Sequence, residues 1–324
     1  MTTLPGAITD RLRLPLIAAP MLRISGPDLV VAASNAGVIG SFPTANARGG
    51  AQQLDDWMTE MRERTGPASA PIAPNLIIQQ TRRDEHLELL VRHRFELVIT
   101  SVGSPAPVVD DLHAVGTLVF ADVATLKHAR KAVDAGADGL ILLTAGSGGQ
   151  TGWLNPFAFV TAVRSFFDGP VVLAGGISDG RSLLAAQALG CDLAYMGTKF
   201  IATDESMASE EYRAMLVDSS LDDILLTNAF TGLPTSMLLP AILEAGLDPQ
   251  LLDEQVTPPE AAVMYGGNSE TSGPKRWQHI FSAGHSVSGV TTRSSVAELV
   301  ETTLREYELA QRQTVEQWNE RQNA

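Results

Sequence analysis

The stretch that decides the fold runs from residue 170 to residue 201, PVVLAGGISDGRSLLAAQALGCDLAYMGTKFI. It opens with a short apolar, β-branched run, which is typical of a strand buried on both faces. The amphipathic run 181–189 predicts a helix with Ser178 or Asp179 as its N-cap, and residues 193–196 predict the next strand. The stretch therefore predicts a strand, a helix and a second strand, the unit from which parallel sheets are built.

Glycine turns follow both of these strands. Gly175 and Gly176 come directly after the first strand, and Gly197 and Thr198 come directly after the second. Glycine lets a ligand approach the backbone without a Cβ in the way, and free peptide N–H groups bind phosphate. In a (β/α)8 barrel the loops after strands 7 and 8 commonly hold a phosphate group. The spacing thus predicts a site for a phosphate-bearing cofactor.

The chain up to residue 220 repeats this alternation of strand and helix. Apolar runs predict eight strands, at residues 14–21, 38–42, 72–78, 97–101, 117–121, 139–144, 170–174 and 193–196. Helices are predicted at residues 27–36, 51–64, 84–94, 106–114, 125–135, 155–167, 181–189 and 209–217. The alternation implies a parallel sheet with crossover helices, and eight strands imply closure into an α/β (β/α)8 TIM barrel. An open, doubly wound sheet is the alternative, but it does not explain why glycine-rich turns follow strands 4, 6, 7 and 8 alike.

The pattern changes after the eighth strand, and this change predicts the domain organisation. Residues 1–220 are expected to form the barrel with its cofactor site. Residues 221–290 are expected to form a lid over the C-terminal face of the barrel, because they are irregular and rich in Pro, Gly and aromatic residues. A final amphipathic helix, capped by Ser294 or Ser295, is expected within residues 291–324 and completes the barrel.

The composition excludes several classes of function. The net charge of −14 disfavours nucleic-acid and anionic-membrane partners, and no apolar run approaches the roughly 18 residues of a membrane span. The single cysteine, Cys191, is expected to be a buried core thiol and fits a reducing compartment. With no signal-peptide pattern at the N-terminus, we expect a cytoplasmic protein. No Cys/His cluster, HExxH motif or paired-carboxylate spacing points to a metal or hydrolytic site.

Short motifs at the predicted strand ends carry a family resemblance. They are APM (19–21), Asn75, AGSGGQTG (145–152), AGGISDGRS (174–182), MGTKF (196–200), LTNAFTG (226–232) and KRWQHIFSAG (275–284). In this order the motifs resemble the nitronate monooxygenase family, once called 2-nitropropane dioxygenases. The FMN-dependent enoyl reductases of bacterial fatty-acid synthesis share its barrel. The resemblance covers nearly the whole chain and implies FMN as the cofactor.

The resemblance also implies a role for individual residues. The flavin ring would lie against Ala19, Pro20 and Met21, and Asn75 would bind the ring or the ribityl edge. The phosphate would be held by the glycine turns, Gly175, Gly176, Gly197 and Thr198, in agreement with the spacing argument. The cofactor would also lie beside Gly148 and Gly149, the paired glycines of the strand-6 loop. Asn75 has an alternative role, which is to satisfy a neighbouring polar group within the sheet.

One position departs from the family pattern. Gln150 occupies the place in the strand-6 loop where the family usually has a histidine that handles a proton. Glutamine can orient a substrate but does not titrate, so chemistry that removes a proton from a neutral carbon acid is in doubt. His285 is the best candidate for a replacement, with His128 and Tyr265 as alternatives. The remaining helix histidines, His86, His93 and His113, are expected on solvated faces.

The resemblance implies an FMN-dependent oxidoreductase that oxidises an alkyl nitronate with O2. Gln150 is compatible with this reaction, because the nitronate anion needs no deprotonation. An NAD(P)H-dependent flavin reductase of enoyl thioesters or quinones is the first alternative. A flavin-binding protein with little turnover is the second. The expected partners are a small-molecule substrate and O2 or NAD(P)H, without nucleic acid or membrane, and a homodimer is compatible with the sequence.

Overall fold

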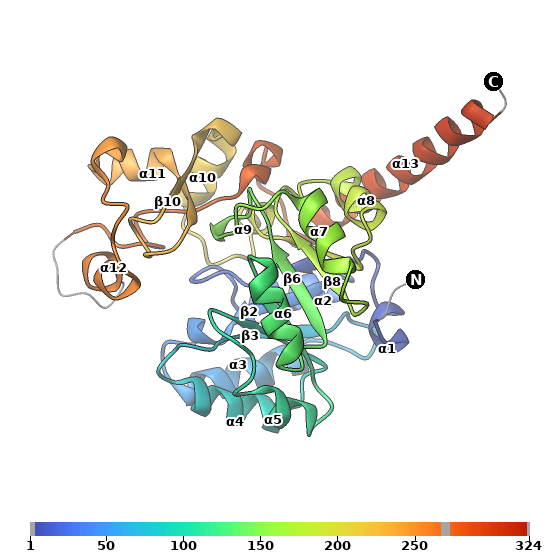
Figure 1. Cartoon of the computed structure of the whole chain (residues 1–324), viewed down its shortest axis with the longest axis horizontal. Coiled ribbons are helices and arrows are strands. Elements are labelled where there is room, and N and C mark those ends of the chain that lie inside the picture. Colours follow the sequence, from blue (N-terminus) through green and yellow to red (C-terminus); the bar gives the residue numbers. More distant parts are fainter. Residues whose placement is uncertain (1–3, 267–272, 323–324) are drawn as a thin grey trace.

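Eight parallel strands close into a barrel in the computed structural model, which describes residues 4–266 and 273–322 (Figure 1). The strands follow one another around the barrel in chain order. They are β1 (Leu16–Ala18), β2 (Ile39–Pro43), β3 (Ile72–Ile77), β4 (Leu97–Ser101), β5 (Leu118–Val123), β6 (Gly139–Leu143), β8 (Val171–Ala174) and β9 (Leu193–Met196). The predicted TIM barrel is thereby confirmed, and the open sheet is excluded. β1 is shorter than predicted because Pro15 and Pro20, on either side of it, cannot donate to a ladder.

Helices follow the strands on the outside of the barrel, as predicted. They are α2 (Pro27–Asn35), α3 (Ala51–Glu63), α4 (Arg83–His93), α5 (Val109–His113), α6 (Leu126–Asp134), α7 (Pro156–Arg164), α8 (Gly180–Ala188) and α10 (Glu210–Asp218). Shorter segments are α1 (Gly6–Thr9), η1 (Thr44–Asn46) and α9 (Thr198–Ile201). The helix predicted over 106–114 begins only at Val109, because Pro105 and Pro107 hold the preceding residues in a turn. Asp179, rather than Ser178, caps α8 and accepts a hydrogen bond from Ser182 N at 2.7 Å.

Alternate strand residues fill the interior of the barrel. The inward-facing apolar side chains include Ile17, Ile39, Ile99, Phe120, Ile141 and Val172, which are all fully buried. Large and small residues are matched across strands: a Cβ on Gly139 would lie 2.5 Å from the Phe120 ring. The barrel is therefore a packed core, and a ligand can bind only at its ends.

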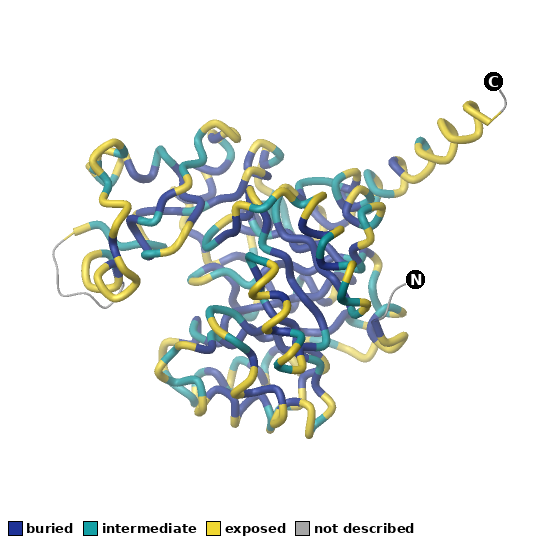
Figure 2. Tube along the Cα trace, viewed as in Figure 1, coloured by how far each residue is buried: buried dark blue, intermediate teal, exposed yellow. Residues whose placement is uncertain are grey.

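The last helix, α13 (Val296–Gln322), packs across α8 and α2 and then projects away from the body (Figure 1). Ser295 caps it, as predicted, and its first turns contribute Val296 and Val300 to the core cluster beneath α2 and α8. Its distal half is exposed (Figure 2). No helix in the described part of the chain has the length and hydrophobicity to cross a membrane.

Residues 221–266 and 273–290 lie beside the C-terminal end of the barrel and have a small core of their own, built around Phe230. Their elements are η2 (Leu221–Asp223), β10 (Ile224–Thr227), β11 (Thr235–Leu238), α11 (Leu239–Glu244), η3 (Pro249–Leu251), α12 (Pro258–Tyr265) and η4 (His285–Gly289). β11 pairs on one side with β10 and on the other with β7 (Gly149–Gln150), a two-residue strand in the loop after β6. The segment is thus joined by a sheet to the loop that carries Gln150.

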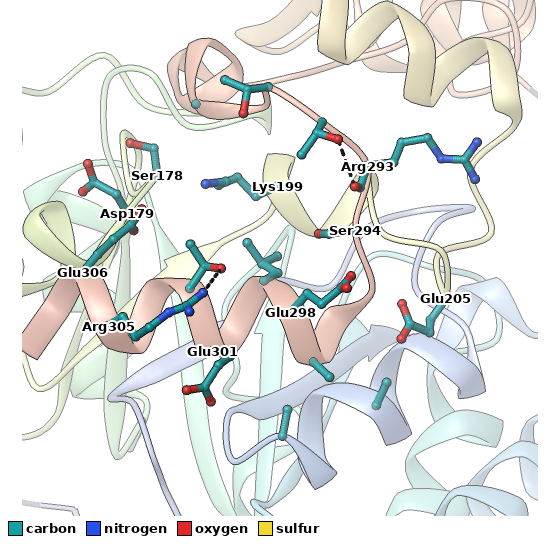
Figure 3. Close-up of a pocket in the computed structure, with 18 of the residues that line it drawn as sticks. Ser178, Asp179, Lys199, Glu205, Arg293, Ser294, Glu298, Glu301, Arg305 and Glu306 are labelled. Carbon is teal, nitrogen blue, oxygen red and sulfur yellow. Dashed lines mark hydrogen bonds between the residues drawn. The ribbon is translucent and has the colours of Figure 1, made fainter.

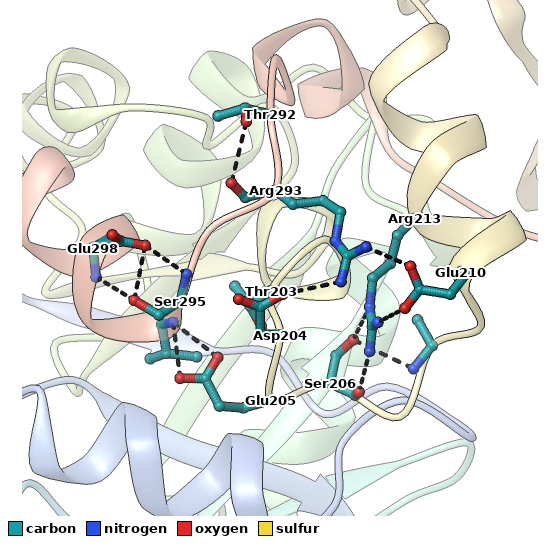
Figure 4. Close-up of polar contacts among 12 residues, drawn as sticks. Thr203, Asp204, Glu205, Ser206, Glu210, Arg213, Thr292, Arg293, Ser295 and Glu298 are labelled. Carbon is teal, nitrogen blue, oxygen red and sulfur yellow. Dashed lines mark hydrogen bonds and ion pairs between the residues drawn. The ribbon is translucent and has the colours of Figure 1, made fainter.

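A cluster of ion pairs and hydrogen bonds fixes the start of α13 to the segment after β9 (Figure 4). Arg293 forms ion pairs with Asp204, at 3.1 Å, and with Glu210. Glu205 accepts a hydrogen bond from Val296 N at 3.0 Å. These contacts position α13 against the barrel before it reaches α8.

Candidate active site

A cavity of about 1010 Å³ lies at the C-terminal ends of the barrel strands, between the barrel loops and residues from the ranges 231–258 and 276–286. This is the end where TIM-barrel enzymes bind their substrates. The predicted site residues that line it are Ala19, Pro20, Met21, Asn75, Gly148, Gly149, Gln150, Gly175, Gly176, Gly197 and Thr198. His285 is not among the described residues that line the cavity. The fold therefore gathers residues from distant parts of the sequence around one space.

The glycine pair after β8 has the geometry expected of a phosphate cradle. Gly175 and Gly176 have φ angles of +118° and +75°, which side chains other than that of glycine rarely adopt. A Cβ on Gly176 would have no described atom within 4 Å, so it would extend into open space. A Cβ on Gly175 would instead lie 2.5 Å from Thr144 Oγ1. Gly176 thus offers bare backbone to a ligand, and Gly175 is required by its packing.

The second glycine turn has an additional structural role. Thr198 is buried, and its Oγ1 accepts a hydrogen bond from Gly284 N at 3.0 Å. This bond ties the end of β9 to the segment that covers the cavity. The hydroxyl still has its own hydrogen to donate to a ligand.

Asn75 lies on β3 at the cavity, with an exposed fraction of 4%. Its Nδ2 donates to Ser101 Oγ at 3.1 Å, and Ser101 Oγ lies 3.2 Å from its Oδ1. The amide is therefore held in place by the neighbouring strand. Its predicted contact with a flavin stays a prediction.

Two residues at the cavity were not singled out by the sequence. Asp122 lies on β5, and its Oδ1 is buried without a hydrogen-bond partner among the described residues; burial raises its pKa to about 7. Tyr195 lies on β9 and is 9% exposed, and its hydroxyl also lacks a partner within residues 4–266 and 273–322. Burial, and then the charge of Asp122, raise the pKa of Tyr195 well above its usual value. The signal for Asp122 is an acid at the end of the apolar run LVFADV, one residue beyond the predicted strand 117–121.

Comparison with known proteins assigns the chain to a family. The family profile described as nitronate monooxygenase matches residues 72–306. The chain belongs to the nitronate monooxygenase family. It is therefore an oxidoreductase, and family membership implies a flavin.

Some relatives of this family member are named as dehydrogenases of a carboxyl-CoA compound and others as nitronate monooxygenases. It is 29% identical over 240 residues to a hydroxy-methyl-oxo-octahydro-indene-carboxyl-CoA dehydrogenase of Rhodococcus jostii, covering 74% of this chain and 67% of that one. It is 26% identical to a nitronate monooxygenase of Paraburkholderia phytofirmans, covering 73% and 76%. Among solved structures, FabK from Thermotoga maritima has a TM-score of 0.78 at 26% identity, covering 98% of this chain and 99% of that one. A nitroalkane oxidase from Streptomyces ansochromogenes has a TM-score of 0.77 at 26% identity, covering 95% and 100%.

In this nitronate monooxygenase family member, the loop after β6 packs tightly against residues 283–285. A Cβ on Gly148 would lie 2.8 Å from Gly284 N, and one on Gly146 would lie 2.7 Å from His285 Nδ1. His285 N also donates to Gly146 O at 2.9 Å. His285 thus supports the backbone of the loop, whereas Gln150 lines the cavity itself. The proton-handling role of His285 stays a prediction.

The prediction for His86 was wrong. This histidine is only 2% exposed, and its Nδ1 lies 2.9 Å from Thr44 Oγ1, because that face of α4 packs against η1. Burial lowers the pKa of His86, which favours its neutral form. His93 is also mostly buried, and its Nε2 lies 2.6 Å from Asp55 Oδ1.

The other titratable candidates divide between the cavity and the surface. His113 is exposed, as predicted, and pairs with Asp138 at 2.8 Å. His128 lines the cavity from the first turn of α6. Tyr265 packs edge-on against Phe230 at a ring-centre distance of 4.9 Å and is not among the described lining residues. His128 is therefore the candidate for the proton-handling role that lies at the cavity.

A second hollow, of about 1220 Å³, lies on the flank of the barrel between α13, α2 and the start of α8 (Figure 3). Its charged residues have mixed signs: Lys199, Arg293 and Arg305 lie among Glu205, Glu298, Glu301 and Glu306. Of the described residues that line it, none is a predicted site residue. This groove is lined mainly by α2, α13 and residues 289–294, so we place the active site in the first cavity, which the predicted site residues line. In the described residues no cluster of His, Cys, Asp or Glu could hold a metal ion.

Proposed function

We propose that this chain is an FMN-dependent oxidoreductase that oxidises an alkyl nitronate with O2. The observation that carries the proposal is the cavity at the barrel mouth, where Gly176 presents bare backbone in a left-handed conformation. Such a turn fits the phosphate of FMN, since a Cβ there would fill the space that the phosphate needs. Family membership supports the flavin.

The residues around the cavity divide into two parts. Gly175, Gly176, Gly197 and Thr198 would hold the phosphate, with Gly148 and Gly149 beside the cofactor. Ala19, Pro20 and Met21 would lie against the ring, and Asn75 would bind the ring or the ribityl edge. A flavin held by these residues would supply the redox chemistry, as an electron acceptor for the substrate and an electron donor for O2.

The protein's own groups suit an anionic substrate. Gln150 can donate an amide hydrogen bond to a nitro oxygen, but it cannot remove a proton from carbon. Lys131 and Arg276 also line the cavity, and Arg276 is fixed by a hydrogen bond from Nη1 to Phe230 O at 2.7 Å. We further propose that residues 221–266 and 273–290 act as a lid that excludes water, since Trp277 and Ala283 line the cavity from this side.

The test is anaerobic mixing of the purified, FMN-loaded protein with ethyl nitronate, nitroethane, NADH or NADPH. We expect the flavin spectrum to change rapidly with ethyl nitronate and slowly with the other three. Rapid reduction by NADPH together with no response to the nitronate would refute the proposal. Colourless protein that ignores added FMN would refute the cofactor assignment itself.

The role of Gln150 has a separate test. If this position handles the proton in the family, Gln150→His should raise turnover of neutral nitroethane more than turnover of ethyl nitronate. Gln150→Asn is the matched control, because asparagine keeps the amide and does not titrate. Equal behaviour of the two variants toward nitroethane would show that the proton is handled elsewhere.

An NAD(P)H-dependent flavin reductase of enoyl thioesters or quinones is the second candidate. The specific observation in its favour is that two relatives, from Rhodococcus jostii and Mycobacterium tuberculosis, are named as dehydrogenases of a carboxyl-CoA compound. The matched regions span 67% and 64% of those proteins. The anaerobic experiment separates the two candidates, because only this one predicts rapid reduction by NADH or NADPH.

A further inference from the structure

Asp122 and Tyr195 form a polar pair on the floor of the cavity. Leu118 and Phe120 precede Asp122 on the inward face of β5, and Tyr195 occupies the corresponding level on β9, where it pairs in register with Ala174 and Ile17. The Tyr195 hydroxyl is buried, and both residues line the cavity. They therefore lie in the uppermost inward layer of the barrel, directly below the ligand space.

Neither buried oxygen is satisfied by the surrounding protein. Asp122 Oδ1 and the Tyr195 hydroxyl have no hydrogen-bond partner in the described ranges, while the nearby Asn75 and Ser101 satisfy one another. Leaving a buried polar group unpaired is unfavourable, because the group has lost its hydrogen bonds to water without gaining new ones. Such groups in a cavity are typical of a ligand site, because the ligand supplies the missing partner.

The groups around Asp122 do not keep its carboxyl group fully ionised. Tyr195 also lines the cavity, and the charge of Asp122 contributes to its raised pKa. The neighbouring strands contribute Ser101 on β4 and Ile141 on β6, which carry no charge. The other titratable groups among the described lining residues are His128 and Lys131 on α6, Tyr212 on α10, and Arg276. Below its pKa of about 7, Asp122 is protonated, and the floor then presents O–H donors from both the acid and the phenol.

We propose that Asp122 and Tyr195 each donate an O–H hydrogen bond to acceptor atoms of the flavin ring, so that FMN binds most tightly when Asp122 is protonated. This inference rests on the proposed function, since it takes FMN as the ligand. The ring offers two carbonyl oxygens and unprotonated nitrogens as acceptors. A carboxylate at Asp122 has no hydrogen to donate and would repel these atoms.

The sign of the pH dependence follows from the protonation state. Burial raises the pKa of Asp122 to about 7, and an O–H···acceptor bond to the ligand raises it further in the complex. FMN affinity is then full below about pH 7 and falls as the pH rises above it. The limiting slope is tenfold per pH unit, because one proton is taken up on binding.

The experiment measures the FMN dissociation constant of the full chain, freed of flavin, by quenching of flavin fluorescence from pH 6 to pH 9. For the unsubstituted chain we expect the dissociation constant to rise at least fivefold between pH 7 and pH 9. Asp122→Asn keeps the shape and an N–H donor, so its dissociation constant should not rise in this range. Titration of the FMN phosphate is common to both proteins and cancels in the comparison. Asp168→Asn, an exposed acid before β8, is the matched control and should keep the original pH profile.

Tyr195→Phe provides a second measurement. It removes one donor and keeps the ring, so FMN should bind about three- to tenfold more weakly at pH 6.5, with the pH dependence retained. Identical pH profiles for Asp122→Asn and the unsubstituted chain would overturn the inference, as would unchanged affinity in Tyr195→Phe. Tight, pH-independent FMN binding would overturn only this inference, whereas failure to bind FMN at any pH would overturn the proposed function.

Discussion

Gly176 and Gly116 form a matched pair for testing the phosphate cradle. Their φ angles are +75° and +81°, and neither would place a Cβ within 4 Å of a described atom. A left-handed conformation costs an ordinary residue about 1–2 kcal/mol. Gly176→Ala and Gly116→Ala should therefore reduce the free energy of unfolding by the same amount, about 1–2 kcal/mol each.

The two variants should differ in FMN binding, because only Gly176 lines the cavity. Gly116 lies between α5 and β5, at the opposite end of the barrel. A methyl group on Gly176 would occupy the space assigned to the phosphate, so we expect at least tenfold weaker binding, or about 1.4 kcal/mol. Gly116→Ala should bind FMN with unchanged affinity.

Two assays are needed to separate stability from binding. Urea denaturation of the flavin-free chain gives the free energy of unfolding, and quenching of flavin fluorescence gives the dissociation constant of FMN. An unchanged dissociation constant in Gly176→Ala would refute the cradle. Equal loss of affinity in both variants would show that the effect comes from general destabilisation.

Three further predictions concern stability, each measured by urea denaturation. Asp179→Ala removes the N-cap of α8 and should cost about 1 kcal/mol; no loss would mean that the cap is not needed. Gly180→Ala raises helix propensity, yet its Cβ would overlap Tyr307 N of α13, so we expect a loss of about 1–3 kcal/mol where propensity alone predicts a gain. The hydrogen bond from His93 lowers the pKa of Asp55, so this stabilisation is present above the unfolded pKa of Asp and is lost as the pH falls through the folded pKa. Asp55→Asn should cost at most about 1 kcal/mol at pH 7 and should lose less stability than the unsubstituted chain between pH 5 and pH 3.

The sequence was sufficient for the barrel because each strand is a short, mostly apolar run and the runs alternate regularly with helical patterns. The same pattern located the cavity, since the glycine turns mark the C-terminal ends of β8 and β9. It could not reveal β7, whose two residues are too few for a period and which forms only because β11 is present to pair with it. It also could not show that Asp122 and Tyr195 face one space, because barrel closure brings them together. His86 was misplaced because a polar residue on a polar helix gives no sign that η1 covers it.

The packing of α13 affects the order in which the protein can fold during synthesis. The barrel strands end at Met196, but the outer layer over α2 and α8 is completed by Val296, Leu299 and Val300. About a hundred residues must therefore be translated between the last barrel strand, β9, and α13, the helix that covers α2 and α8. Until then the apolar faces of α2 and α8 remain open to water, where nascent chains are prone to aggregate. A chaperone that covers the apolar faces of α2 and α8 until α13 has been translated should therefore raise the yield of folded enzyme.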